Sequence, residues 1–262
     1  MPDADAAADL TLLAAAAREA GEIALRWFRR DPTVWEKAGG SPVSEADLAA
    51  DRHLSERLRG ARPDWGWLSE ETTDGPERLA RSRVFVVDPI DGTRAFLRGE
   101  AEWAVSVAVV EAGRPVVAAL YQPATDTLWT AVVGGGAHRN GTPIRVSDRH
   151  DFAGCRIAAP RKYLESRELR GIRFASRAFV PSLALRLTHV ADDRVDVAYG
   201  TGNAHDWDLA AADLLVQEAA GRLTSFDGEP IRYNRAVPRH PPLVAAVPAL
   251  HDEACRLLGR LA

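Results

Sequence analysis

The spacing of apolar residues changes along the chain, and each spacing predicts a different element. From Asp9 to Arg30 apolar residues recur every three or four positions, which predicts an amphipathic helix, and a second helix is expected to open after Ser44. Val84–Val87 is an uninterrupted apolar run, typical of a buried strand. Since Pro89 cannot donate to a sheet ladder, we expect that strand to end at Asp88.

The rest of the chain divides into two patterns. Runs at 104–110, 116–122 and 127–133 predict successive antiparallel strands, and Asn140-Gly141 predicts a hairpin turn. Beyond residue 150, short strands alternate with expected helices at 182–192 and 205–220, followed by a last helix ending at Leu261. We therefore expect a layered α/β fold, with an α+β domain over residues 1–150 and an α/β domain over 151–262.

Composition restricts the possible functions. The chain has 262 residues, 46% of them hydrophobic and 27% charged, with a net charge of -4, so binding to nucleic-acid polymers or anionic membranes is not favoured. The first six residues are acidic where a signal peptide is basic, and no apolar run approaches the roughly 20 residues that span a bilayer, which predicts a cytoplasmic location. Cys155 and Cys255 belong to no CxxC unit, so neither a disulfide framework nor a thiolate zinc site is expected.

Two carboxylates follow the Val84–Val87 run within four residues. Asp88 stands at its expected end, Asp91 comes three residues later, and Gly92-Thr93 adds flexible backbone and a hydroxyl where a helical turn is expected to begin. Because neighbouring carboxylates raise each other's pKa, a bound cation would keep both ionised. A solvated Asp-Gly turn is the alternative, whereas an aspartyl-nucleophile phosphatase is disfavoured because its two aspartates stand two residues apart.

These residues carry a resemblance to a known group. Asp88-Pro-Ile-Asp91-Gly-Thr93 resembles the signature of the inositol monophosphatase superfamily, which includes 3'(2'),5'-bisphosphate nucleotidases and more distant fructose bisphosphatases. The superfamily's second signature, Trp-Asp-x-Ala-Ala followed by Glu-Ala-[Gly/Ala]-Gly, is matched within Trp207–Gly221. Two signatures in the right order are far harder to obtain by chance than one. The resemblance spans Pro42 to Gly221 and implies an αβαβα sandwich with metal-dependent phosphatase activity.

The resemblance also implies the metal ligands. They would be four carboxylates and one carbonyl, belonging to Glu70, Asp88, Asp91, Asp208 and Ile90 respectively. A set of oxygen donors without sulfur or imidazole selects Mg²⁺ or Mn²⁺ over zinc. Four carboxylates exceed the charge of one divalent ion, so two or three ions are expected. On the residues alone, Glu70-Glu71 is typical of a solvated loop. Lys37 is either a cation on the phosphate side or a surface lysine, and its isolation in the sequence favours the surface lysine.

Catalytic and phosphate-binding roles follow from the same resemblance. Pro42–Asp47 matches a segment whose aspartate works with the signature threonine, here Thr93, to orient and deprotonate the attacking water. Glu70 would polarise that water, while Asp91, Gly92 and Thr93 would surround the phosphate. Independently of the resemblance, Ser44 and Asp47 form the pattern of a helix capping box. Both roles of Asp47 are compatible at a helix N-terminus.

The substrate is less directly indicated. Inositol-cleaving relatives carry a glutamate at the position of Thr201, but Tyr199–Ala204 contains no carboxylate, and the Asp-Gly-Thr-Arg-Ala-Phe ending resembles the bisphosphate nucleotidases. Residues 155–177 hold seven basic residues against two acids, typical of a solvated face or of a site for a second phosphate. Our candidate substrate-binding residues are Arg161, Arg170, Arg173 and His205.

The expected activity is hydrolysis of adenosine 3',5'-bisphosphate, so the expected partner is a small phosphorylated metabolite. Inositol 1-phosphate and histidinol phosphate are alternative substrates. A non-catalytic regulatory relative is an alternative of another class, although every catalytic position implied by the resemblance is intact. A homodimer is possible because dimers are frequent among relatives.

Overall fold

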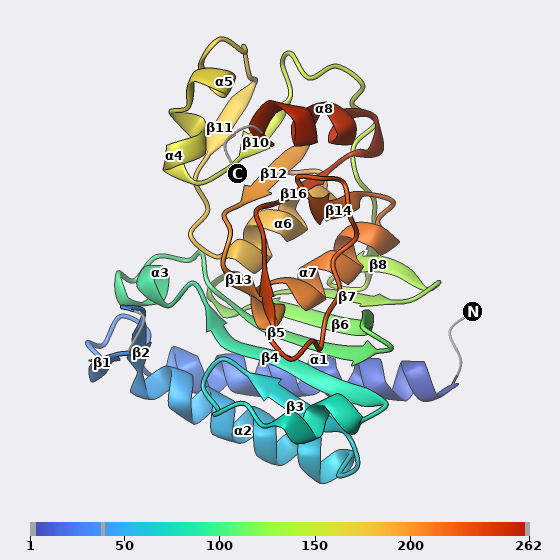
Figure 1. Cartoon of the computed structure of the whole chain (residues 1–262). Helices are drawn as coiled ribbons and strands as arrows, with labels where there is room; N and C mark the ends of the chain where they lie inside the picture. Colours follow the sequence, from blue (N-terminus) through green and yellow to red (C-terminus); the bar gives the residue numbers. More distant parts are fainter. Residues whose placement is uncertain (1–3, 38–39, 260–262) are drawn as a thin grey trace.

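Five layers stack in the computed structural model, which describes residues 4–37 and 40–259 (Figure 1). Helices α1 (Ala4–Leu25) and α2 (Glu45–Ala61) cover one face of a seven-stranded sheet. Helices α6 (Leu183–Ala191) and α7 (Asp206–Glu218) lie between that sheet and a five-stranded sheet, and α8 (Pro248–Leu258) packs beyond the second sheet. The expected αβαβα sandwich is therefore confirmed.

The seven-stranded sheet has the order β3-β4-β5-β6-β7-β8-β9. Only β3 and β4 are parallel, and every other neighbouring pair is antiparallel. Alternate residues of β4 enter different cores: Phe85 and Val87 pack with α1 and α2, whereas Val84 and Val86 belong to the core shared with α7. The strand bounds are Gly66–Ser69, Arg83–Asp91, Ala104–Glu111, Arg114–Gln122, Thr127–Val132, Gly136–Arg139 and Thr142–Ile144.

The second sheet has the order β11-β10-β12-β16-β14, with its first three strands parallel and the others antiparallel. In that order the bounds are Ser176–Ala178, Arg156–Ala158, Val197–Gly200, Leu243–Ala246 and Arg222–Ser225. Two small ribbons pair β1 (Val34–Glu36) with β2 (Pro42–Ser44) and β13 (Ala204–His205) with β15 (Arg239–His240). The remaining helices are η1 (Pro76–Ala80), α3 (Thr93–Leu97), η2 (Pro123–Thr125), α4 (Arg161–Leu164) and α5 (Arg167–Arg170).

One strand end differs from its prediction. Strand β4 continues through Pro89 to Asp91, whereas the sequence predicted an end at Asp88. Asp88 lies opposite Ser106 and Asp91 opposite Ala104, so β4 contains one residue more than its partner over this stretch. Such a bulge takes residues out of the regular ladder, which is how a proline is accommodated within the strand.

Two helix ends also differ. Helix α1 ends at Leu25, before the predicted Arg30. Helix α7 ends at Glu218, and Ala220 adopts the left-handed conformation (φ 68°) expected of the following glycine. Gly221 is needed for space, since a Cβ there would lie 2.8 Å from a methyl group of Val216.

The remaining predictions concern the hairpin turn, the last helix and the division of the chain into domains. Asn140 and Gly141 form the predicted hairpin turn with positive φ angles of 48° and 78°. The predicted last residue of α8, Leu261, lies outside the described residues, and the division near residue 150 stays a prediction. Among the described residues, no helix is both long and apolar enough to cross a membrane.

Candidate metal centre and active site

Three aspartates from two layers converge at one edge of the seven-stranded sheet. Asp88 and Asp91 lie at the end of β4, and Asp208 lies in the first turn of α7. One carboxylate oxygen from each lies within 4.8 Å of the other two. The two signature segments, which are remote in sequence, therefore form one acidic cluster.

The bulge in β4 brings Asp88 and Asp91 together. Residues three apart on a regular strand point to opposite faces, but one extra residue reverses the alternation and directs both carboxylates to the same side. Gly92 follows with a φ of 97°, and a Cβ there would lie 2.8 Å from the carbonyl oxygen of Glu102. Only glycine combines that conformation with so close an approach.

The backbone holds each aspartate of the cluster differently. Asp88 Oδ1 accepts a hydrogen bond from the Ile90 amide at 3.0 Å. The Asp91 side chain contacts the N-terminus of α6, where it accepts hydrogen bonds from the Ser182 hydroxyl and, at 2.7 Å, from the Ala184 amide. Asp208 accepts from the His205 amide at 2.6 Å. These bonds use one oxygen each of Asp88 and Asp208, whereas both oxygens of Asp91 accept, Oδ1 from the Leu183 amide at 3.4 Å.

The electrostatics of the cluster fit a cation. Burial, followed by the charge of Glu70, raises the pKa of Asp88 well above its usual value. Burial also raises the pKa of Asp91 to about 6, and burial with the nearby Asp91 charge raises that of Asp208. Asp88 Oδ2 is buried and has no hydrogen-bond partner in the described part of the chain. An unpartnered carboxylate oxygen among like charges is stabilised by a divalent ion.

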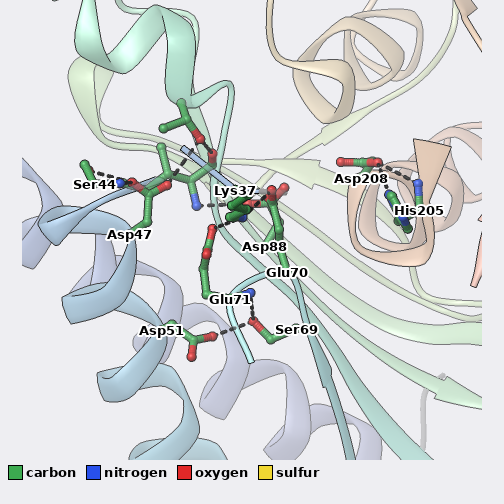
Figure 2. A network of polar contacts seen from close by, with 12 residues as sticks. Lys37, Ser44, Asp47, Asp51, Ser69, Glu70, Glu71, Asp88, His205 and Asp208 are labelled. Carbon is green, nitrogen blue, oxygen red and sulfur yellow. Dashed lines mark hydrogen bonds and ion pairs between the residues drawn. The ribbon is translucent and has the colours of Figure 1, made fainter. Parts of the chain in front are cut away.

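Glu70 lies beside this cluster and is bound by a lysine. Its amide donates to the carbonyl of Val87 at 3.2 Å, which places it next to the end of β4. Lys37 Nζ lies 2.8 Å from Glu70 Oε1 and 2.6 Å from Glu71 Oε1 (Figure 2). The interpretation of Lys37 as a surface lysine is therefore wrong. No local signal could have found these contacts, because the partners lie more than thirty residues away.

Asp47 and Thr93 form a hydrogen-bonded pair near the cluster. Asp47 Oδ2 accepts from the Ser44 amide at 2.8 Å and the Ser44 hydroxyl at 2.5 Å, so the predicted pairing of these residues at the start of α2 is present (Figure 2). Thr93 Oγ1 lies 3.2 Å from Asp47 Oδ1 and 3.1 Å from the Ile90 carbonyl oxygen. Burial outweighs the Ser44 bonds and raises the pKa of Asp47 to about 6.

Sequence reasoning missed a hydrogen-bond network that supports the segment carrying Glu70 and Glu71. Asp51, one turn beyond Asp47 on α2, accepts hydrogen bonds from the Ser69 hydroxyl at 2.5 Å and the Thr72 hydroxyl at 2.8 Å. The Glu71 amide donates in turn to Ser69 Oγ at 3.3 Å (Figure 2). A buried acid at helical spacing from Asp47 was the only available signal. The network fixes the backbone that carries both glutamates.

A cavity of about 290 Å³ opens onto the cluster. All of the predicted metal-ligand and phosphate-binding residues line it, as do two arginines and an aromatic side chain. The complete lining is Ser41, Pro42, Glu70, Asp88, Ile90, Asp91, Gly92, Thr93, Arg94, Arg98, Phe179, Pro181 and Asp208.

The candidate substrate-binding residues are placed differently. The Arg161 guanidinium lies 5.6 Å from the ring centre of Phe179, so Arg161 adjoins the cavity. Arg170 and Arg173 are exposed and do not line it; Arg170 ends α5, which packs on α8. His205 stacks on Trp207 and accepts from Arg239 Nε at 3.1 Å, and it too is absent from the lining.

Other basic side chains of residues 155–177 have structural partners. Arg156 donates to Asp193 and Asp196, and Arg177 donates to three backbone carbonyls. Part of the positive charge of this segment is therefore neutralised by aspartates, and part is engaged in hydrogen bonds to backbone carbonyls. Within it, Arg161 remains the candidate nearest the site.

A carboxylate cluster at a cavity in a layered α/β fold is the arrangement that a metal-dependent phosphoric monoester hydrolase requires. The sequence profile of the inositol monophosphatase family matches residues 6–261. The chain belongs to the inositol monophosphatase family, as the resemblance of its two signatures indicated.

Individual relatives carry different names. The chain is 36% identical to inositol-1-monophosphatase of Rhizobium meliloti, covering 81% of this chain and 80% of that protein. It is 34% identical to histidinol-phosphatase of Mycobacterium tuberculosis (96% and 98% covered) and 30% identical to 3'(2'),5'-bisphosphate nucleotidase CysQ of Aggregatibacter actinomycetemcomitans (84% and 85%). The crystal structure of extragenic suppressor protein suhB from Bartonella henselae superposes with a TM-score of 0.85 at 32% identity, covering 96% of this chain and 98% of that one.

Proposed function

We propose that the chain hydrolyses a small phosphomonoester with Mg²⁺, or Mn²⁺ in its place, held by Asp88, Asp91, Asp208 and Glu70. The single observation that carries this proposal is the convergence of three aspartates, two of them buried and Asp208 half-buried, around an unpartnered carboxylate oxygen. All four side chains offer hard oxygen donors, and the Ile90 carbonyl lies on the same cavity. When bound, divalent ions would neutralise phosphate charge and lower the pKa of water.

Asp47 and Thr93 would accept the proton of the attacking water. The Thr93 hydroxyl has one hydrogen and two acceptors within reach, at 3.2 Å on Asp47 and 3.1 Å on Ile90. When the hydroxyl donates to Asp47, its oxygen can accept a proton from water and pass its own to the carboxylate. A pKa of about 6 makes Asp47 an effective base near neutral pH, since it is ionised there yet basic enough to hold a proton.

The turn after β4 supplies the phosphate contacts. Gly92 and Thr93 line the cavity directly beside Asp91. The Thr93 and Arg94 amides at the start of α3 would donate to phosphate oxygens, whereas the Ala95 and Phe96 amides already donate to the Gly92 carbonyl. Asp91 would then act through the bound metal, and the Ser182 and Ala184 bonds to it fix its position.

For the substrate, we propose a 3'(2'),5'-bisphosphorylated nucleotide, adenosine 3',5'-bisphosphate. Arg94 and Arg98 line the cavity, Phe179 offers an aromatic surface that is 45% exposed, and Arg161 lies against that ring. Cations suit a second phosphate, and an exposed ring suits a planar base. Histidinol phosphate is the second candidate, because similarity to the histidinol-phosphatase extends over 96% of this chain.

A substrate panel at fixed Mg²⁺ tests the activity. We expect turnover of adenosine 3',5'-bisphosphate to exceed that of histidinol phosphate, inositol 1-phosphate and fructose 1,6-bisphosphate, and to stop when the metal is chelated. Turnover that persists after chelation would contradict the metal mechanism. Failure to cleave any of these substrates or p-nitrophenyl phosphate would favour a non-catalytic relative.

Arg161 provides the test of substrate choice. Arg161→Glu should raise KM for adenosine 3',5'-bisphosphate while leaving p-nitrophenyl phosphate unaffected. The double variant Arg170→Glu/Arg173→Glu is the matched control, because it changes the charge of the same segment away from the cavity. If Arg161→Glu and the control behave alike, this segment does not select the nucleotide.

A further inference from the structure

The segment Ile231–His240, here called the strap, joins the two sheets beside α7. In Figure 1 it descends in orange and red from the five-stranded sheet toward the seven-stranded sheet. Near the start of the strap, the Tyr233 amide donates to the carbonyl of Gly113, in the turn between β5 and β6, at 3.1 Å. The strap therefore contacts the sheet that carries Asp88 and Asp91.

The strap also binds the first turn of α7, two residues from Asp208. Asp206 is fully buried, and both of its carboxylate oxygens are bound by the strap: His240 Nε2 lies 2.6 Å from Oδ1, and the Asn234 amide donates to Oδ2 at 2.6 Å. The Asp206 amide donates to the Pro238 carbonyl at 3.1 Å. Farther along α7, the Tyr233 hydroxyl donates to Asp213 at 2.9 Å.

A buried arginine fastens the strap to the first half of the chain. Arg78 of η1 donates to the side chain of Asn234 at 2.6 Å and to the carbonyl of Arg235 at 3.0 Å. Two further bonds from Arg78 to Asp74, at 2.6 and 2.8 Å, hold the guanidinium in place. Arg78 is only 3% exposed, so the guanidinium side of these bonds is buried, while Asp74 and Arg235 lie at the surface.

We propose that His240 and Arg78 are positioning residues that, through the strap and Asp206, hold Asp208 at the distance from Asp88 and Asp91 that metal binding requires. This inference rests on the proposed function, because it takes Asp208 as a metal ligand. Asp208 belongs to a different layer from the other two aspartates, so small shifts of α7 change the ligand spacing. Direct links between α7 and the first sheet also exist: the Ser106 hydroxyl donates to the Trp207 carbonyl at 3.2 Å, and the Gly134 and Gly136 amides donate to Glu218 at the far end of the helix. Of these, only the Ser106 bond lies beside Asp208.

The test is a calorimetric titration of the purified full chain with Mn²⁺ and Mg²⁺, alongside the melting temperature. His240→Phe keeps a ring but removes the bond to Asp206, whereas His240→Gln keeps an N–H donor. Arg78→Gln loosens the strap from the first sheet without touching α7. We expect His240→Phe and Arg78→Gln to weaken metal binding about tenfold or more, as changes to supporting residues around ligands do. His240→Gln should recover most of the affinity.

His251→Phe is the matched control. His251, a residue of α8, is another fully buried histidine in the same half of the chain, and it is bonded to Thr224 of β14 at 2.9 Å. It should lower the melting temperature and leave the metal dissociation constant unchanged. If His240→Phe and Arg78→Gln also lower only the melting temperature, with dissociation constants within twofold of wild type, the proposal is overturned. If His240→Phe does not fold, Arg78→Gln decides in the same way.

Asp208→Asn separates this inference from the proposed function. A wild-type chain that binds metal, with binding lost in Asp208→Asn, confirms the ligand independently of the strap. A wild-type chain that binds neither ion would refute the proposed function itself.

Discussion

Replacing Asp88 by asparagine should make the metal-free protein more stable and the metal-loaded protein less stable than wild type. Asp88 Oδ2 has no hydrogen-bond donor among the described residues, and the charges of Glu70, Asp91 and Asp208 all disfavour its ionised form. An asparagine retains an oxygen for the Ile90 amide and presents an N–H₂ group to the neighbouring carboxylates. The substitution therefore removes a repulsion and adds possible hydrogen bonds.

The size of the effect follows from the buried carboxylate. An unsatisfied buried polar group destabilises a fold by about 1–3 kcal/mol, and more when it is charged. In a protein of this length, 1 kcal/mol corresponds to roughly 2–4 °C in Tm. We therefore expect Asp88→Asn to melt roughly 2–12 °C higher than wild type in the absence of metal. With Mg²⁺ at 100 times its Kd, the free energy of unfolding of wild type should rise by about 2.7 kcal/mol. The variant should lose most of this metal-induced stabilisation.

The pH dependence has a defined sign. Because the pKa of Asp88 is raised in the folded chain, the folded state holds a proton that the unfolded state releases at about pH 4. The stability of metal-free wild type should therefore fall as pH rises above about 4, and the advantage of Asp88→Asn should grow from pH 5 to pH 8.

Thermal melts with EDTA and with excess Mg²⁺, at pH 5 and pH 8, measure both effects. Asp192→Asn serves as the control, because Asp192 is a carboxylate directly after α6 that is bonded to Trp129 and Arg139 and lies outside both the cluster and the strap. It should retain the Mg²⁺-induced shift. An Asp88→Asn variant that melts at or below wild type in EDTA at pH 8 would refute the electrostatic reasoning.

Three further predictions concern neighbouring residues. Lys37→Met should tighten Mn²⁺ binding about fivefold in calorimetry, because the Lys37 ammonium competes with the metal for Glu70. Fivefold corresponds to roughly 1 kcal/mol of binding free energy, the most that an ion pair of this kind contributes. Weaker binding in the variant would show that Lys37 supports the site instead. Asp47→Asn should lower kcat about 100- to 10,000-fold with little change in metal affinity. It should also abolish the decline of kcat/KM that we expect for wild type below about pH 6, where Asp47 becomes protonated. If the variant still shows that decline, the decline belongs to another titrating group. Gly92→Ala should lower Tm and activity together, because the residue has a φ of 97° and a Cβ would lie 2.8 Å from a carbonyl oxygen. A variant with normal melting and turnover would contradict the tight packing of this turn.

Local residue patterns predicted much of the fold. The apolar periods located most helices and strands, and the Ser44 and Asp47 spacing identified the start of α2, because these features depend on residues a few positions apart. The Asn140-Gly141 turn was predictable for the same reason. The two signatures identified the family, whereas the kind of metal, which was predicted from the oxygen-only donor set, stays a prediction.

The end of β4 was not predictable from those patterns. Proline was interpreted as a stop, but the sheet accommodates it in a bulge that also reverses the direction of Asp91. The choice between ending a strand and bulging it depends on the opposite strand, here on Ser106 and Ala104 of β5. That partner is not visible in the local sequence.

What the sequence alone determined is which side chains can do chemistry and in which elements they stand. Only the tertiary structure decided that Asp208 meets Asp88, that Lys37 contacts Glu70, and that Arg161 adjoins the cavity while Arg170 does not. The physical reason is range: helix periods, caps and turns are set by neighbours along the chain. Convergence of remote side chains is set by the packing of whole layers and by the long-range hydrogen bonds that hold those layers in place.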